Sequence, residues 1–249
     1  MTSRLAVFTL TTLVCAALSC AAQEAAAKKA APAATTQASA GPTLDAVLSQ
    51  MDSAATNFKA AQADFVGKQY TRVVDETDTQ EGTIYFRRSG NATEAYTDIS
   101  KPIRKYWLYA GDKVQVYEPG IDHLTVYDVG QKRDAVESFL VLGFGGKGHD
   151  LPKSYELKMG GAETIDGVHT AKLELVPKSE KARGMFNRIV LWIDMSGGTK
   201  GVSLQQQFFE PSGDYRLVHY SNIRLNQPLP GDTFKLKTTS KTKKITPQG

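Results

Sequence analysis

From about Ala63 onward, apolar and polar residues alternate in short runs that are separated by turn residues. The first runs are DFVGKQYTRVV, GTIYFRR, EAYTDI, KYWLYA, KVQVYEP and HLTVYDV, with AGD and EPGID as turns. Later runs are YELKMGG, VHTAKLELVP, NRIVLWIDM, GVSLQQQFFEP, YRLVHYSNIRL and TFKLKTT, with PSGD at 211–214 as a hairpin turn. Successive side chains of a strand point to opposite faces, so the pattern predicts a long antiparallel sheet with one apolar face.

A helix is predicted immediately before the strands. Its apolar positions recur at spacings of three and four residues: Leu44, Val47, Leu48, Met51, Ala54, Ala55 and Phe58. Thr43 is the expected N-cap, and Asp45 in the first turn suits the helix dipole.

A second helix is predicted in the middle of the chain, within KRDAVESFLVLGFGGKGHDLPKSY. Asp134 and Glu137 stand at capping-box spacing, and Val136, Phe139 and Leu140 share one face. The following GFGGKGHD does not fit a phosphate-binding loop, because glycine follows the lysine where serine or threonine is required. We expect its glycines to give a mobile loop.

A long sheet with one apolar face has to bury that face against something. We therefore expect a mainly β (α+β) domain: an unclosed antiparallel β-barrel, or strongly curved sheet, with a helical lid. Alternation along GTIYFRRSG places Arg88 on the same face as Ile84 and Phe86, and Arg87 on the other face. If the Ile84 face is buried, Arg88 is either a strand end reaching water or a polar anchor.

The N-terminus predicts export. Arg4 followed by the uncharged run LAVFTLTTLVCAALS is typical of a secretory signal peptide, which we place at 1–22. ALSC at 17–20 resembles a lipoprotein cleavage box with two positions inverted, so lipidation at Cys20 competes with ordinary cleavage after Ala21 or Ala22. Residues 23–42 are rich in alanine, proline and threonine and predict a flexible linker, leaving 43–249 as the folded domain.

Composition and motifs favour a binding protein over an enzyme. The formal net charge is only +4, and the one basic cluster, in the C-terminal tail, is typical of a solvated segment, so we expect no nucleic-acid partner. The four histidines, His123, His149, His169 and His219, show no metal-ligand spacing, and no nucleophile motif occurs. We expect no catalytic residues, no metal and no cofactor. The alternatives are a hydrolase with acidic or histidine side chains in its cavity, and a sensor or scaffold domain with a filled barrel.

Several of these features occur together in a recognisable order. A signal peptide is followed by a helix running into DFVGKQY, the strand EGTIYFRR, a mid-chain helical insertion and the ending LPGDTFKLKTTSKTKKI; the elements after the signal peptide extend over about residues 43–246. In this order they resemble the periplasmic outer-membrane lipoprotein carrier family (LolA-like). The resemblance implies a helix-lidded half-barrel whose hydrophobic cavity holds the acyl chains of lipoproteins on their way to the outer membrane. It also implies an inner-membrane release complex and an outer-membrane acceptor as partners, and a monomer.

The resemblance gives Arg88 a role. In that family, an arginine ending the corresponding strand holds the closed state by hydrogen bonding to the lid, which implies contacts between Arg88 and carbonyls near 139–146. The chain departs from the family pattern where SGNATEAYTDI follows this arginine in place of a proline and an aromatic-rich strand. The long linker and Cys20 are more like the lipid-anchored LolB-type receptor of the same fold. An anchored acceptor or a general lipid-binding protein is therefore the alternative to a soluble carrier.

A carrier needs an apolar cavity wall. The wall candidates are Ile84, Phe86, Val114, Val116, Leu191 and Ile193 on the sheet, and Phe139 and Leu140 on the lid. For each of them the competing interpretation is ordinary core packing.

Overall fold

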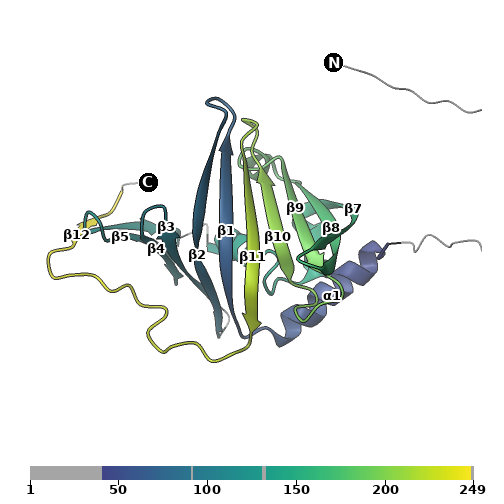
Figure 1. The fold of residues 1–249 in the computed structure, drawn as a ribbon, viewed down its shortest axis with the longest axis horizontal. Helices are drawn as coiled ribbons and strands as arrows, with labels where there is room; N and C mark the ends of the chain where they lie inside the picture. Colours follow the sequence, from purple (N-terminus) through teal and green to yellow (C-terminus); the bar gives the residue numbers. More distant parts are fainter. Residues whose placement is uncertain (1–40, 91, 131–132, 248–249) are drawn as a thin grey trace, which may run out of the picture. The chain divides into compact units, whose positions relative to one another are not determined.

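One twelve-stranded sheet forms the body of the protein (Figure 1). The computed structural model describes residues 41–90, 92–130 and 133–247, so the predicted signal peptide, Cys20 and nearly all of the predicted linker lie outside the described residues. The strand order across the sheet is β12-β6-β5-β4-β3-β2-β1-β11-β10-β9-β8-β7. The strands are β1 (Ala60–Thr71), β2 (Glu76–Ser89), β3 (Ala92–Lys101), β4 (Lys105–Ala110), β5 (Lys113–Glu118), β6 (His123–Asp128), β7 (Tyr155–Ile165), β8 (Val168–Pro177), β9 (Arg188–Asp194), β10 (Ser203–Phe209), β11 (Tyr215–Leu225) and β12 (Lys243–Ile245).

The sheet is mostly antiparallel and does not close, which confirms the predicted fold class. Only the short β12 pairs in parallel, with β6, and β12 and β7 form the two edges. The helices are α1 (Leu44–Asn57), α2 (Arg133–Leu140), the 3-10 turn η2 (Gly148–Asp150), α3 (Leu151–Ser154) and α4 (Glu180–Arg183). We call the face that carries α1 the inner face.

Helix α1 covers the inner face over β8, β9 and β10 (Figure 1). It starts as predicted, because Thr43 Oγ1 accepts a hydrogen bond from the Ala46 backbone N–H at 3.3 Å. The buried residues of this core are Val47, Leu48, Met51, Leu142, Leu151, Ala171, Leu173, Leu175, Ile189, Leu191, Ile193 and Phe208. This half of the sheet is therefore covered by a tightly packed helix.

A second core lies over β1, β2, β3 and β11, and a loop segment rather than a helix covers it. Phe144, from the segment between α2 and η2, is fully buried there. Its ring stacks on Phe86 with centroids 5.2 Å apart and meets the edge of Tyr220 at 4.7 Å. Such aromatic pairs stabilise the packing beyond the area they bury. The segment from 141 to 148 is thus a packed cover for the sheet.

This finding corrects the mobile loop expected for GFGGKGHD, since its glycines permit close packing. Gly145 has a φ of +94°, and a Cβ added there would lie 2.6 Å from the Phe58 ring. A Cβ on Gly148 would lie 2.5 Å from the Leu48 carbonyl oxygen of α1. A side chain at either position would push the segment away from its neighbours.

The predicted strand TFKLKTT is wrong. Thr233 N–H bonds to the Pro230 carbonyl and Lys235 N–H to that of Asp232, so the segment forms consecutive turns. Since β11 is already bonded to β1 and β10, the chain after it has no free strand edge beside it. It finds one only at β6, where Lys243–Ile245 pairs as β12 (Figure 1).

Replacement of Gly148 by alanine should destabilise the fold, because the added methyl group collides with the α1 backbone. We expect a loss of about 1–3 kcal/mol in the free energy of unfolding, typical of overpacking at a rigid contact. Gly120→Ala is the control, since a Cβ there meets no atom within 4 Å. Urea unfolding of both variants checks this, and equal midpoints would contradict the close contact with α1.

Candidate functional site

A cavity of about 540 Å³ opens on the inner face between the sheet and helix α2. Its size lies within the range of about 300–1,000 Å³ typical of ligand pockets. Strands β1 to β5 and β11 supply most of the wall, and α2 supplies the remainder. The large apolar side chains of the wall are Phe65, Ile84, Ile99, Trp107, Leu108, Tyr109, Val114, Val136, Leu140, Val218 and Tyr220.

Three of the eight wall candidates line this cavity: Ile84, Val114 and Leu140. Val116 is buried on the same face of β5 as Val114 but does not reach the cavity. Trp107 was not predicted as a wall residue. It shares one face of β4 with Tyr109, lines the cavity and is 44% exposed. Its alternation with a second aromatic residue was the signal available in the sequence.

The other four candidates lie in packed parts of the structure. Phe86 is buried beneath Phe144, and Leu191 and Ile193 are fully buried in the core under α1. Phe139 of α2 points to a cluster with Phe186 and Phe208, with ring centroids 5.5 and 5.1 Å away. Alternation identified the inner face, but helix docking decided which part of it stays open.

The cavity is polar at one end. Lys68, Gln69, Asp78, Gln80 and Arg216 line it close to the turn between β1 and β2. The rest of the wall consists of apolar and aromatic side chains from the strands and α2, with Thr97 of β3 as its one polar aliphatic member among the described residues. A cavity with an apolar interior and a polar mouth suits a ligand with a long apolar part attached to a polar group.

Helix α2 is fixed to the wall by a polar contact. Glu137 Oε1 accepts hydrogen bonds from the Tyr109 hydroxyl at 3.0 Å and from Arg133 Nε at 2.9 Å. Burial, and then the bond to Glu137, raises the pKa of Tyr109 to about 12, so this hydroxyl stays a donor. Asp134 lies inside α2, which begins at Arg133, rather than at the N-cap position that the predicted capping box requires, and Glu137 bonds to Tyr109.

Arg88 joins β2 to both covers of the inner face. Its Nη1 donates to the Ala55 carbonyl of α1 at 3.2 Å and its Nη2 donates to the Gly145 carbonyl at 3.1 Å. The guanidinium also lies over the Phe58 ring, 5.6 Å from its centroid. The last turn of α1 contains no basic residue, so Arg88 supplies the positive charge that the helix C-terminus favours.

These contacts lie on the face that alternation assigned to Arg88. The bond to Gly145 falls within the segment 139–146 named from the resemblance, whereas the bond to Ala55 was not expected. Its neighbour Arg87 instead forms an ion pair with Glu94 of β3 and lies over Phe234. The function of Arg88 as a latch stays a prediction.

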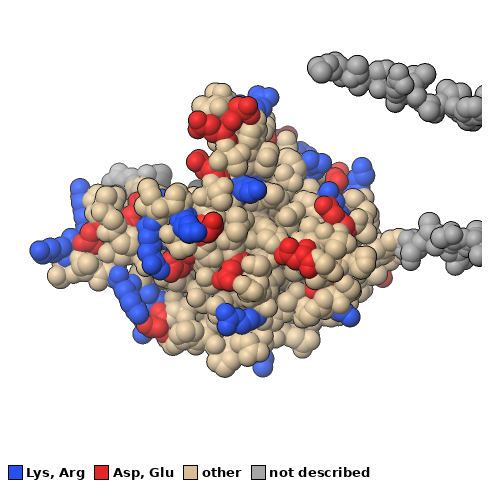
Figure 2. Space-filling model, viewed as in Figure 1, with Lys and Arg blue, Asp and Glu red and all other residues tan. Residues whose placement is uncertain are grey.

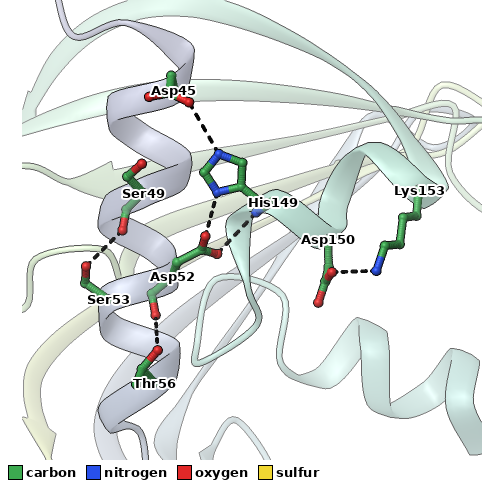
Figure 3. Close-up of polar contacts among 8 residues, drawn as sticks. All are labelled: Asp45, Ser49, Asp52, Ser53, Thr56, His149, Asp150 and Lys153. Atoms are coloured by element: carbon green, nitrogen blue, oxygen red, sulfur yellow. Dashed lines mark hydrogen bonds and ion pairs between the residues drawn. The ribbon is translucent and has the colours of Figure 1, made fainter.

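A second polar clamp joins α1 to the turn η2 (Figure 3). The His149 ring nitrogen Nδ1 lies 2.5 Å from Asp52 Oδ2, and Nε2 lies 3.4 Å from Asp45 Oδ1. The His149 backbone N–H also donates to Asp52 Oδ1 at 3.2 Å. The sequence predicted no partner for His149, because the residues around it do not indicate that Asp45 and Asp52, about a hundred residues away, lie beside it.

The two carboxylates favour a charged imidazole. The hydrogen bond to Asp52, followed by the one to Asp45, raises the pKa of His149 above its usual 6.5. Burial on its own would raise the pKa of Asp52, but the hydrogen bonds from His149 together outweigh it and lower that pKa. The clamp is therefore an ion pair in which His149 is protonated and Asp52 ionised.

Comparison with known proteins identifies the family. Residues 56–237 match the family model of the outer membrane lipoprotein carrier protein LolA. The chain is 25% identical over 179 residues to the outer-membrane lipoprotein carrier protein of Dechloromonas aromatica (strain RCB), which covers 72% of this chain and 77% of that protein. The chain belongs to the LolA family of outer-membrane lipoprotein carriers, which confirms the resemblance inferred from the sequence.

Solved structures support the fold. An uncharacterized conserved protein from Thermus thermophilus aligns with a TM-score of 0.51 at 12% identity, over 81% of this chain and 97% of that one. MucB aligns with a TM-score of 0.50 at 13% identity, over 78% of this chain and 62% of the MucB chain. At these identities the likeness concerns the fold alone.

Two further observations bear on the class of protein. Among residues 41–90, 92–130 and 133–247, no helix has the length and apolar character needed to cross a membrane. The same residues contain no group of three or more histidine, cysteine, aspartate or glutamate side chains arranged to hold a metal ion.

The clamp predicts a specific pH dependence. Because the folded-state pKa of His149 is raised, its contribution to stability is complete below pH 6.5 and is lost as the pH rises through the folded-state value. Asp52, with a lowered pKa, contributes above pH 3.8 and loses its contribution as the pH falls through its folded-state value. His149→Gln should therefore destabilise the protein more at pH 5.5 than at pH 9.

Urea unfolding of wild type and variant across this pH range measures the difference. Lys153→Gln is the control, since it removes a positive charge from α3 and breaks only the exposed pair with Asp150 (Figure 3). A destabilisation by His149→Gln that stays constant, or grows, with rising pH would contradict the clamp.

Proposed function

We propose that the protein is a periplasmic carrier that holds the acyl chains of lipoproteins in its cavity and moves them towards the outer membrane. The observation that carries the proposal is the cavity itself, apolar inside and polar at its mouth. Removing one methylene group from water is worth about 0.8 kcal/mol, so long acyl chains cannot cross an aqueous compartment unprotected. Membership of a family of lipoprotein carriers supports the same conclusion.

The chemistry of the wall favours binding rather than catalysis. Its side chains are mainly aliphatic and aromatic, and the charged ones stand at the mouth. The hydrolase alternative would need acidic or histidine side chains inside the cavity. An open cavity also argues against the filled barrel of a sensor or scaffold domain. An inner-membrane release complex and an outer-membrane acceptor are the partners that a carrier of this kind would require.

Within this proposal, Arg88 is a latch on the empty state. Its two hydrogen bonds hold the C-terminus of α1 and the 141–148 segment against β2. Acyl chains that fill the cavity would press on Tyr220, which lines it and meets Phe144, and the proposal links the resulting movement of the Phe144 segment to the breaking of the Gly145 bond. When cargo leaves, re-forming both bonds would favour closure and so help to expel the lipid.

Arg88→Leu should bind lipoprotein but release it poorly. A hydrogen bond to a charged group contributes about 1.5–3 kcal/mol, and the low end applies because Arg88 is an exposed residue. Loss of about 1.5 kcal/mol shifts the closed-to-open equilibrium roughly tenfold towards the open state. Transfer of bound lipoprotein to outer-membrane vesicles, followed over time, measures the release rate.

Arg87→Leu is the matched control, because this neighbouring arginine pairs with Glu94 and contacts neither cover. It should transfer cargo at the wild-type rate. Normal transfer by Arg88→Leu would show that Arg88 is no latch, and failure of the wild type to bind lipoprotein at all would overturn the carrier function.

The anchored acceptor is distinguished from the soluble carrier at Cys20. We expect the exported protein to incorporate no radiolabelled fatty acid, since the order of Ala17 and Leu18 departs from the lipoprotein cleavage box. Labelling of the wild type that disappears in Cys20→Ser would instead identify a lipid-anchored acceptor of the same fold.

A further inference from the structure

A basic and apolar loop lies between β8 and β9, beside the lid helix. Its sequence KSEKARGMFN, residues 178–187, contains three basic residues and one acidic residue, which gives a net charge of +2. Lys178, Lys181 and Arg183 are exposed. Lys178 Nζ donates a hydrogen bond to the Pro152 carbonyl at 2.6 Å. Within the described ranges, no carboxylate lies at ion-pair distance from the three side chains, so the charges of Lys181 and Arg183 above all are available to a partner.

The same loop exposes a large apolar side chain. Met185 is 57% exposed, and the next residue, Phe186, packs against the protein. Basic residues interleaved with an exposed apolar side chain are typical of segments that bind the interface of anionic bilayers. The basic residues are attracted to the lipid phosphates, while the apolar side chain enters the boundary with the acyl region.

The loop is in direct contact with the lid. The Phe186 ring stacks on Phe139 of α2, with centroids 5.5 Å apart and planes 7° from parallel. Both rings also meet Phe208 of β10, at 5.5 and 5.1 Å. Val136 and Leu140, on the same short helix as Phe139, line the cavity. The exposed loop therefore packs against the same helix, α2, that forms part of the cavity wall.

A neighbouring projection does not share this chemistry. The turn between β1 and β2 exposes Val73 and Val74, but Asp75 and Glu76 follow them directly. Figure 2 shows acidic side chains gathered at this projecting tip. Negative charge there opposes contact with anionic lipid, so the two exposed apolar sites are not equivalent.

We propose that the loop 178–187, with Phe139 of α2, docks on the surface of a bilayer that contains anionic lipids. Docking brings the lid helix to the membrane at the place where acyl chains leave or enter the cavity. The docking follows from the loop itself, whereas its use in lipid transfer rests on the proposed carrier function.

The test is co-sedimentation of the processed chain with lipid vesicles, in a Cys20→Ser background so that no acyl anchor contributes. One set of vesicles contains phosphatidylglycerol mixed with phosphatidylcholine, and the other contains phosphatidylcholine alone. The protein should sediment with the first set and not with the second, and added salt should weaken the binding.

Two variants remove the two parts of the loop's chemistry. Lys181→Glu with Arg183→Glu should lower the vesicle partition coefficient roughly 25-fold or more, since each basic residue near an anionic surface is worth about fivefold. Met185→Asp should lower the partition coefficient roughly tenfold. Met185→Leu keeps an apolar side chain at this position and should bind like the wild type. All these side chains are exposed, so the fold is expected to tolerate the changes.

Matched controls come from elsewhere on the surface. Lys158→Glu with Lys200→Glu removes the same charge from exposed lysines outside the loop, and Ile121→Asp replaces an apolar residue that is 59% exposed on another turn. Both should sediment like the wild type. The proposal is overturned if the wild type ignores anionic vesicles, if it binds both kinds equally, or if the loop variants bind as tightly as the controls.

Binding of a fluorescent fatty acid in the absence of vesicles separates this proposal from the carrier function. The loop variants should bind this probe like the wild type, because the loop does not line the cavity. A wild type that sediments with anionic vesicles but takes up no probe would refute the carrier function and leave the docking in place.

Discussion

The structure depends on one constraint: the inner apolar face of an open sheet has to be kept from water without closing the sheet. A closed barrel would bury that face against itself, but here β12 and β7 remain separate edges. Under α1 the cover is complete, and residues such as Leu191 are fully buried. Over β2 to β5 the cover is partial, which leaves Trp107 partly exposed and a cavity beneath α2. The unequal cover thus leaves a cavity on one half of the inner face.

The covers are held by polar contacts at their ends as well as by apolar packing. Arg88 bonds to Ala55 near the C-terminus of α1, and Asp52, one turn earlier, pairs with His149. Both contacts link α1 with the segment that runs from Phe144 to η2. Such directional bonds favour one arrangement of the helix and the segment. Each bond can also break without leaving an unpaired charge in the protein interior, because Arg88 and His149 are exposed residues. Under the proposed carrier function, a cover that opens and closes would be better held by contacts of this kind than by packing alone.

Much of the fold follows from patterns that are local in sequence. Period-two alternation identified most strands and the face of Arg88, and the 3.6-residue period with Thr43 identified α1. Alternation could not show that α1 docks on Leu191 and Ile193 and leaves Ile84 and Val114 beside the cavity, since this depends on contacts between distant elements. The segment TFKLKTT has the right alternation for a strand but no free edge to pair with. The glycines at 145 and 148 were interpreted as sources of mobility because their close neighbours, Phe58 and Leu48, lie about ninety or more residues away.

Gly145 joins the buried cover of the sheet to the hydrogen bond with Arg88. The residue after Phe144 has to bring its carbonyl to Arg88 while the Phe58 ring lies against its Cα, and only a residue without a Cβ fits at a φ of +94°. Phe144 is held by Phe86 on the same strand that carries Arg88 two residues later. Under the proposed carrier function, movement of that ring would act directly on the carbonyl that Arg88 holds. Such a coupling would need no long pathway, because Phe144 meets Tyr220 of the cavity wall and is followed directly in the chain by Gly145.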